Sequence, residues 1–508
     1  MKNIVALLFL LVTLSVVSQT NTEVYLFDLV EKEQKTTLDN KRNISNNIGY
    51  DNQPSFINDS IVLFSSTRNN QTDIAAYLIN DKKTQWISAT PNGSEYSPTK
   101  IPGLNEISSI RLDKDGKQLL YRYDYKTGKS KVLLEDLKVG YHTWYNKDII
   151  VSSVLKENAL SLVLSNTKDK TTNTIQKNIG RSLHKIPNSN LISYISKEGT
   201  TWEIKSVNPI TRTTKKIINT ISESEDMCWL PDGTILMGKG TRIFKYNPKT
   251  DSDWSMFYSF IDKEIGTISR IATNPEGNML AVVSDVSPEH IVQKQLEAYN
   301  SRKIDSFLST YATNTSIYNY PDSLRYKGRE EMRPYYAKKF KEQTNLHCEI
   351  RHRIVFGNKV IDEEYVTYND KNVRVASIYE VKNEKIDKVT FIRPQQDIEE
   401  KNIKKIVQQQ LDAYNARDIN AFTNTFANDI KIYNFPNEFL YEGREKLKEN
   451  YSDFFNTTPD LNCKINNRIV MGNKVIDEEF LTINGKNLNA VAIYEVKNGK
   501  ISKVTFLK

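Results

Sequence analysis

The chain of 508 residues carries 70 basic and 62 acidic side chains, which leaves a formal charge of +8. This excess is small beside the total, and no run of Lys and Arg interleaved with aromatic residues occurs, so the composition argues against nucleic-acid binding. The 27 tyrosines and 19 phenylalanines argue against long disorder, and the length allows two to four globular domains.

The N-terminus, MKNIVALLFLLVTLSVVSQT, has the pattern of a secretory signal peptide. Lys2 precedes an apolar stretch that begins at Ile4, and Val16 and Ser18 are small residues before a cleavage point. The stretch is too short to span a bilayer and no second one follows, so no transmembrane segment is expected. We predict that residues 1–18 are removed on export to a periplasm or to the outside of the cell, with a Gram-negative bacterium as the suspected source.

The region that follows, residues 22–285, contains strand-like runs separated by turns at intervals of about 41 to 45 residues. Six such units begin near residues 54, 97, 142, 184, 228 and 269. This spacing predicts a six-bladed β-propeller in which each unit is one four-stranded sheet. Pro-Asp-Gly at 231–233 and Pro-Glu-Gly at 275–277 are expected to form tight turns between adjacent strands.

The first unit, DNQPSFINDSIVLFSSTRNNQTDIAAYL, resembles the TolB-like (WD40-like) propeller repeat in its P-S-F, F-S-S-T-R and T-D-I elements. The sixth unit stops after AVVSD, whereas an extra strand, TEVYLFDLV, stands at the start. We expect this N-terminal strand to complete the last blade, because the pairing removes an open sheet edge. The propeller is expected to dock an unknown protein or glycan, since no G-x-S-x-G motif of a hydrolase domain occurs.

The last two fifths of the chain are a duplication. Residues 290–392 align with residues 405–507 without a gap, and GNKVIDEE occurs unchanged in both copies, 115 positions apart. Cys348 and Cys463 occupy matching positions, so we expect two buried, small apolar side chains rather than a disulfide between them.

Within each copy, helical spacing comes first and strand alternation follows. The first copy has two predicted hairpins, and the first hairpin turns at Gly357, where glycine tolerates the positive φ of a tight turn. The last hairpin of the second copy turns at Asn498 and Gly499. Glu384 replaces this glycine in the first copy, so we expect a different turn there. The spacing i, i+3, i+4, i+7 of a short helix is formed by Ile304, Phe307, Leu308 and Tyr311.

This order of elements, with the stretches QLDAYNARDINAFTNTFANDIKIYNFP and RIVMGNKVIDEEF, resembles the NTF2-like fold in its SnoaL-like branch. The predicted fold class is multidomain, with an all-β propeller of six blades and two α+β NTF2-like cone domains. NTF2-like domains often associate through their sheets, so an intramolecular pseudo-dimer is expected. The expected boundaries are 1–18 for the signal peptide, 22–285 for the TolB-like propeller, 288–393 and 403–508 for the SnoaL-like domains, and 394–402 for the linker.

Members of this fold that act on steroids use a tyrosine, an aspartate base and a protonated aspartate. The resemblance places these three positions at Gln295, Asn319 and Ser377 in the first copy and at Gln410, Asn434 and Ala492 in the second. Asparagine cannot accept a proton at neutral pH, so the isomerase mechanism does not transfer to this chain.

The repeated DEE triplet offers other acids. On a strand, Asp362 and Glu364 share one face and Glu363 lies on the other, so at least one carboxylate points toward whichever face is covered. The alternative is an exposed acidic strand whose charges pair with neighbouring Lys and Arg.

The candidate site residues follow from these positions and from the family fold. The candidate bases are Asp362 and Asp477, and the candidate hydroxyl donors are Tyr318 and Tyr433. The candidate ligand-pocket residues are Asn319, Tyr326, Arg329, Tyr336, Arg353, Asn434, Tyr441, Arg444, Tyr451 and Arg468. No histidine or cysteine spacing of a metal site occurs, and neither a metal nor a cofactor is expected.

Two functions remain open. The first is an exported, non-catalytic binding protein whose propeller docks a partner and whose cones bind a small apolar ligand or mediate assembly. The second is a SnoaL-like enzyme of the isomerase, cyclase or hydrolase class that uses acid/base catalysis without a cofactor. The loss of all three acid/base positions in both copies favours the first function.

Overall fold

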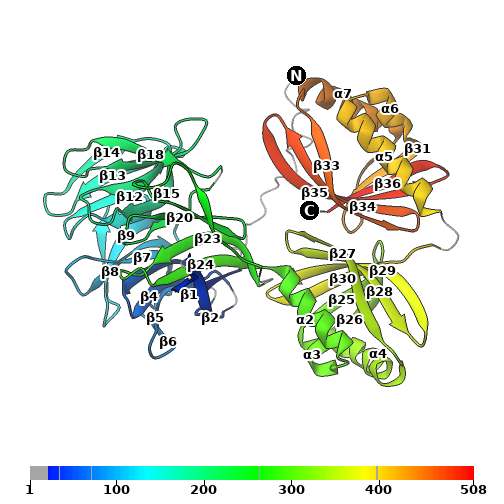
Figure 1. Ribbon diagram of the computed structural model, residues 1–508, viewed down its shortest axis with the longest axis horizontal. Coiled ribbons are helices and arrows are strands. Elements are labelled where there is room, and N and C mark those ends of the chain that lie inside the picture. The colour runs from blue at the N-terminus through cyan, green and yellow to red at the C-terminus, as the bar shows by residue number, and fades with distance from the viewer. Residues whose placement is uncertain are drawn as a thin grey trace. The chain divides into compact units, whose positions relative to one another are not determined.

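The computed structural model describes residues 21–33, 35–47, 49–69, 71–222, 224–261, 264–395 and 399–507 (Figure 1). The predicted signal peptide, residues 1–18, lies outside these residues. The chain divides after Ser287 into two compact units. In the part that the structure describes, every helix is too short or too polar to cross a membrane.

In the described residues, the first unit forms six antiparallel sheets of four strands each, which confirms the predicted six-bladed propeller. Five blades are built from consecutive strands, and each predicted unit contributes the first strand of a blade. The strands are β3 (Asn52–Asn58), β4 (Ile61–Arg68), β5 (Gln71–Leu78), β6 (Lys83–Trp86), β7 (Gly93–Lys100), β8 (Glu106–Asp113), β9 (Gln118–Asp124), β10 (Ser130–Leu134), β11 (Val139–Trp144), β12 (Ile149–Lys156), β13 (Ala159–Asn166), β14 (Thr171–Gln176), β15 (Ile179–Lys185), β16 (Ile192–Ser196), β17 (Glu203–Val207), β18 (Thr214–Asn219), β19 (Met227–Trp229), β20 (Ile235–Lys239), β21 (Arg242–Tyr246) and β22 (Ser255–Ser259).

The sixth blade joins the two ends of the first unit. Its strand order is β2 (Lys35–Asn43), β1 (Thr22–Lys32), β24 (Met279–Val286) and β23 (Ile265–Thr273), with β1 antiparallel to β24 (Figure 1). The predicted closure by the N-terminal strand is therefore confirmed, with a second N-terminal strand added outside it. The alternating side chains of β1 enter two different cores, one shared with the first blade and one shared with the fifth.

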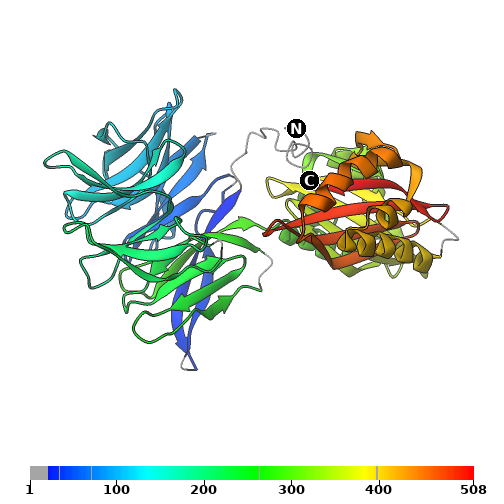
Figure 2. The same ribbon diagram turned by 90° about the horizontal axis from the view of Figure 1, so that it is seen from above.

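The second unit contains two repeat domains of identical topology. Each has one mixed six-stranded sheet, in which the first and last strands of the domain's chain path, such as β25 and β30, pair in parallel. Figure 2 shows the helices of the second repeat domain along one face of its sheet. The first repeat domain comprises α2 (Pro288–Asn300), α3 (Ile304–Ser309), β25 (Tyr311–Asn319), β26 (Ser323–Lys327), α4 (Arg329–Glu342), β27 (His347–Phe356), β28 (Lys359–Tyr368), β29 (Lys371–Lys382) and β30 (Lys385–Ile392). The second comprises α5 (Glu400–Ala416), α6 (Ile419–Asn424), β31 (Phe426–Asn434), β32 (Glu438–Glu442), α7 (Arg444–Thr457), β33 (Asn462–Met471), β34 (Lys474–Ile483), β35 (Lys486–Lys497) and β36 (Lys500–Leu507).

The sheet faces opposite the helices share one apolar cluster, which draws Ile361 and Ile378 from the first repeat domain and Ile476 and Ile493 from the second. Polar contacts surround this cluster. The hydroxyl of Tyr320 donates to Glu495 Oε1 at 2.9 Å. Apolar burial of this kind is the main favourable term in sheet packing.

Two local predictions about the repeats need correction. The short helix α3 ends at Ser309, and Tyr311 is instead the first residue of β25, where its side chain is still buried in the core. The turn at Glu384 does not differ from its counterpart. Asn383 and Glu384 have φ values of +50° and +54°, against +51° and +72° at Asn498 and Gly499. The flanking strands pair in the same register in both copies, so the hairpin imposes this backbone on whichever residue is present.

The shared turn predicts opposite effects of substitution in the two copies. Glu384→Gly should stabilise the first repeat domain by about 1 kcal/mol, because glycine adopts the left-handed conformation without steric penalty. The matched change Gly499→Ala should destabilise the second repeat domain by a similar amount. Thermal unfolding of the full chain measures both, and a loss of stability in Glu384→Gly would contradict the strained turn.

Candidate functional site

A cavity of about 210 Å³ lies in the first repeat domain, between its helices and its curved sheet. The walls come from α2, α4 and the strands β27 to β29, and tyrosines contribute much of the lining. Tyr299, Tyr311 and Tyr336 belong to the domain's buried core as well, so the cavity is continuous with that core. A partly apolar cavity with a few polar groups is the usual form of a small-molecule site.

Glu364 on β28 is a buried carboxyl that lines this cavity. The hydroxyl of Tyr379, on the neighbouring strand β29, donates to Glu364 Oε1 at 2.5 Å. Burial, with the nearby Asp362 carboxylate adding to it, raises the pKa of Glu364 to about 7. The Glu364 carboxyl can therefore gain or lose a proton near neutral pH.

Asp362 lines the same cavity but is held differently. Arg353 donates from Nε and Nη2 to the two carboxylate oxygens of Asp362, both at 2.6 Å, and its Nη1 donates to Gln293 on α2 at 3.1 Å. This bidentate geometry occupies both oxygens with strong donors, so Asp362 is poorly placed to accept a proton from a ligand. The prediction that at least one carboxylate of the triplet points toward a covered face is confirmed by the burial of Asp362 and Glu364, and Glu364 is the more available of the two acids.

The alternative of an exposed acidic strand is wrong for the first repeat domain. Asp362, Glu363 and Glu364 are 1%, 6% and 7% exposed. Glu363, on the opposite face, accepts from Arg374 Nε at 2.7 Å and contacts His352 Nδ1 at 2.5 Å.

The second repeat domain repeats this arrangement of acids. The hydroxyl of Tyr494 donates to Glu479 at 2.6 Å, and Arg468 holds both oxygens of Asp477 at 2.6 Å. Burial raises the pKa of Glu479 to about 7 and also raises that of Asp477, with Arg468 opposing the second shift.

The sequence-predicted site residues of the first repeat domain separate into two groups. Tyr336 and Asp362 line the cavity, and Arg353 contacts it through Asp362. Tyr326 lies behind the lining residue Tyr335, with ring centroids 5.8 Å apart.

The other candidates of that domain are outside the cavity lining. Asn319 accepts a hydrogen bond from Arg393 at 2.6 Å, and Arg329 approaches Glu330 at 3.7 Å at the start of α4. Tyr318 lies on β25 beside Thr390 of β30.

Two candidate pocket residues of the second repeat domain, Tyr441 and Tyr451, pack against its apolar core. Burial raises the pKa of Tyr441. Asn434 donates to Glu438 at 2.9 Å, the ring of Tyr433 lies 5.6 Å from that of Phe439, and Arg444 is the first residue of α7.

Sequence reasoning missed Tyr379 and three cavity-lining cations, Arg325, Lys339 and Arg393. In the antiparallel register of β28 and β29, Tyr379 is paired with Val360 and Glu364 with Val375, so the hydrogen bond between Tyr379 and Glu364 is a diagonal side-chain contact that the strand pattern does not predict. The cations lie on β26, on α4 and directly after β30, and only the folded domain brings them together.

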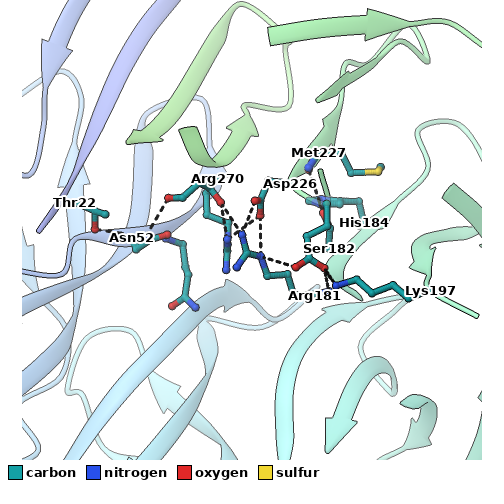
Figure 3. A network of polar contacts seen from close by, with 12 residues as sticks. Thr22, Asn52, Arg181, Ser182, His184, Lys197, Asp226, Met227 and Arg270 are labelled. Carbon is teal, nitrogen blue, oxygen red and sulfur yellow. Dashed lines mark hydrogen bonds and ion pairs between the residues drawn. The ribbon is translucent and has the colours of Figure 1, made fainter. Parts of the chain in front are cut away.

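A second cavity, of about 290 Å³, occupies the centre of the propeller and is lined by the first strands of its blades. Figure 3 shows its polar network, in which two arginines converge on Asp226. Arg181 Nη2 and Arg270 Nη1 donate to Asp226 at 2.6 and 2.8 Å. The histidines nearby are neutral, because burial lowers the pKa of His142 to about 3 and of His184 to about 4.

No cluster of three or more histidine, cysteine or acidic side chains suited to a metal ion occurs in the described residues. Cys348 and Cys463 are buried and free, which confirms the prediction of two buried, small apolar side chains, and Cys228 is buried and free as well.

Asp226 is predicted to stabilise the centre of the propeller. Asp226→Asn leaves Arg181 and Arg270 without their shared carboxylate and should cost about 2 kcal/mol of stability. Calorimetric unfolding of the full chain measures this loss, with the exposed Asp136→Asn as control. Equal unfolding temperatures in the two variants would show that the arginines do not depend on Asp226.

The pKa of Glu364 predicts a pH-dependent stability. Its ordinary pKa is 4.5 and its folded pKa is about 7, so the folded domain retains a proton that the unfolded chain releases, and stability falls as pH rises between these values. Glu364→Gln should lessen this fall by on the order of 3 kcal/mol.

Urea unfolding of the full chain at pH 5 and pH 7.5 measures the difference between wild type and Glu364→Gln. Glu349→Gln, at an exposed position of β27, is the control. Parallel pH profiles for wild type and Glu364→Gln would mean that the Glu364 carboxyl titrates as it does in the unfolded chain.

Comparison with known proteins supports the assignment of the repeat domains. Residues 292–389 and 407–504 each match the model of the SnoaL-like domain. Among curated proteins, none matches the chain in sequence.

Solved structures resemble different parts of the chain. A putative TolB from Agrobacterium tumefaciens is 10% identical, with a TM-score of 0.43, over 52% of this chain and 98% of its own. A cystatin-fold protein from Novosphingobium aromaticivorans is 22% identical, with a TM-score of 0.20, over 21% of this chain and 97% of its own. A putative ketosteroid isomerase from Kribbella flavida is 24% identical, with a TM-score of 0.18, over 21% of this chain and 77% of its own. The two matches to the domain model, together with the six four-stranded sheets of the first unit, show that the chain carries two consecutive SnoaL-like domains after an N-terminal β-propeller.

Proposed function

We propose that this protein is an exported, non-catalytic binding protein whose first SnoaL-like domain holds a small, partly apolar ligand. The observation that carries the proposal is the 210 Å³ cavity, which combines tyrosine rings and valines with buried polar groups at Asp362, Glu364 and Tyr379. An apolar wall supplies affinity, and a few fixed polar groups orient a ligand.

Pairing of the two SnoaL-like domains is the assembly part of the proposal. The apolar cluster shared by Ile361, Ile378, Ile476 and Ile493, with the hydrogen bond from Tyr320 to Glu495, supports an intramolecular pseudo-dimer. The two domains contact each other through the sheet faces opposite their helices, and the cone of each domain lies on the other face of its sheet.

The propeller and the N-terminus complete the proposal. The propeller's central cavity, with its arginine and aspartate network, supports a role in docking a protein or a glycan. The signal-peptide pattern that includes Lys2 and Ser18 supports export.

Glu364 favours a second candidate function, acid/base catalysis in the same cavity. Its pKa of about 7 and its Tyr379 hydroxyl donor suit proton transfer near neutral pH, whereas Asp362 is fixed by Arg353. This version of the enzyme hypothesis replaces the candidate base Asp362 by Glu364.

A neutral fluorescent ligand tests binding in the cone. Val366 and Val373 line the cavity, and the second SnoaL-like domain has Leu481 and Leu488 at the matching positions. The double variant Val366→Leu/Val373→Leu should bind N-phenyl-1-naphthylamine about fivefold more weakly than wild type, because the larger side chains occupy the cavity. Fluorescence titration of the full chain measures the affinity.

The reverse double variant, Leu481→Val/Leu488→Val, is the matched control and should bind as wild type does. Equal affinities of wild type and Val366→Leu/Val373→Leu would place the ligand outside the first cone. Native mass spectrometry then separates the two functions. A molecule of the same mass on wild type and on Glu364→Gln indicates binding alone, whereas a different mass on the variant indicates that wild type converts it.

A further inference from the structure

Three cations lie around the cavity of the first SnoaL-like domain. Arg325 comes from β26, Lys339 from α4, and Arg393 from the segment directly after β30, and all three line the cavity. They are partly or fully exposed, whereas Glu364 and Tyr379 are buried. The cations therefore surround the solvent-facing end of the cavity, and the acid lies at its deep end.

Within the described residues, none of these three cations has a carboxylate oxygen within 4 Å. Arg393 donates to the neutral amide of Asn319 at 2.6 Å. Lys339 Nζ lies 5.1 Å from the ring centroid of Tyr299, and the Arg325 guanidinium lies 5.3 Å from that of Tyr326.

The three positive charges also affect one another. Burial lowers the pKa of Lys339, Arg325 and Arg393 lower it further, and Glu364 opposes the shift. Gathering three cations around one cavity costs free energy unless an anion offsets their repulsion. Asp362 cannot supply that charge, because Arg353 already neutralises it.

The second SnoaL-like domain is an internal comparison, since it derives from the same duplication. The second domain retains the buried hydrogen bond between an acid and a tyrosine, which is formed by Glu479 and Tyr494 in place of Glu364 and Tyr379. At the solvent-facing end, Leu440 stands for Arg325 and Phe454 for Lys339, and both pack against the domain core. The two domains therefore differ at two of the three positions that carry charge around the first cavity, whereas Lys508 keeps a cation at the sequence position that matches Arg393.

We propose that the first SnoaL-like domain binds an amphipathic organic anion, with its apolar part in the cone and its charge at Arg325, Lys339 and Arg393. The second SnoaL-like domain binds none, so the chain takes up one anion. This inference rests on the proposed binding function and adds the class of ligand. Uncompensated guanidinium and ammonium groups form charge-assisted hydrogen bonds with carboxylates.

Matched pairs of carboxylates and carboxamides test the inference, because the members of a pair differ mainly in charge. The pairs are benzoate with benzamide, 1-naphthoate with 1-naphthamide, and decanoate with decanamide. Isothermal titration calorimetry on the full chain should give a stoichiometry of one and an affinity about tenfold higher for the best acid than for its amide.

Two lysines on α4 provide a matched pair of variants. Lys339→Gln, combined with Arg325→Gln, should abolish the preference for the acid, while binding of the amide stays within about twofold of wild type. Lys338→Gln is the control, because the Lys338 side chain is 73% exposed, does not line the cavity and belongs to the same helix.

Each outcome decides between the two proposals. Equal affinity of acid and amide in wild type overturns the anion inference and leaves the binding function in place. A stoichiometry of two overturns the difference between the domains. Failure of every pair and of N-phenyl-1-naphthylamine to bind overturns the binding function as well. Loss of the acid preference in Lys338→Gln overturns the assignment of the charge site to Arg325 and Lys339.

Discussion

Burying three consecutive carboxylates on strand β28 is the constraint on which the first SnoaL-like domain depends. A buried charge without a partner costs several kcal/mol, so each acid needs its own donor. Because side chains alternate along a strand, Asp362 and Glu364 take partners inside the cone and Glu363 takes its partners on the opposite face. Arg353 connects Asp362 to Gln293 on α2, and Tyr379 on β29 donates to Glu364. On the opposite face of the sheet, Arg374 donates to Glu363.

The same constraint makes the two acids of the cone chemically unequal. Arg353 offers two charged donors to Asp362, whereas Tyr379 offers one neutral hydroxyl to Glu364. A neutral donor compensates burial less well than a guanidinium does, so Glu364 holds its proton to a higher pH. The difference between the two acids therefore follows from the type of donor that each one meets. The second SnoaL-like domain has the same donor types, with Arg468 at Asp477 and Tyr494 at Glu479.

The architecture and the acid-bearing strand could be predicted from sequence, because blade spacing, repeat identity and strand alternation are local or periodic signals. Strand β2 was not predicted, because its sequence KTTLDNKRN has a single buried apolar residue, Leu38, and reads as a polar loop. The turn at Glu384 was mispredicted because residue preference favours glycine, while the pairing of β29 with β30 decides the backbone.

The site itself was only partly predictable, since its residues come from distant segments. Arg325, Lys339 and Arg393 are separated by 14 and 54 positions, and only the curvature of the sheet against α4 brings them to one cavity. By contrast, Asp362 and Glu364 are two positions apart on one strand, so alternation alone places them together. Candidates such as Tyr318 and Asn319, taken from the family fold, lie instead near the end of β25.

Duplication also explains why the two cones can differ while their sheets stay alike. The shared apolar cluster requires isoleucines at matching positions of both sheets, so a substitution there disturbs two domains at once. The cone faces carry no such joint requirement. Replacing a charged residue by Leu440 or Phe454 adds apolar burial to the second domain's core, which stabilises it without altering the contact between the sheets. The first domain carries Arg325 and Lys339 at these two positions, and both side chains line its cavity.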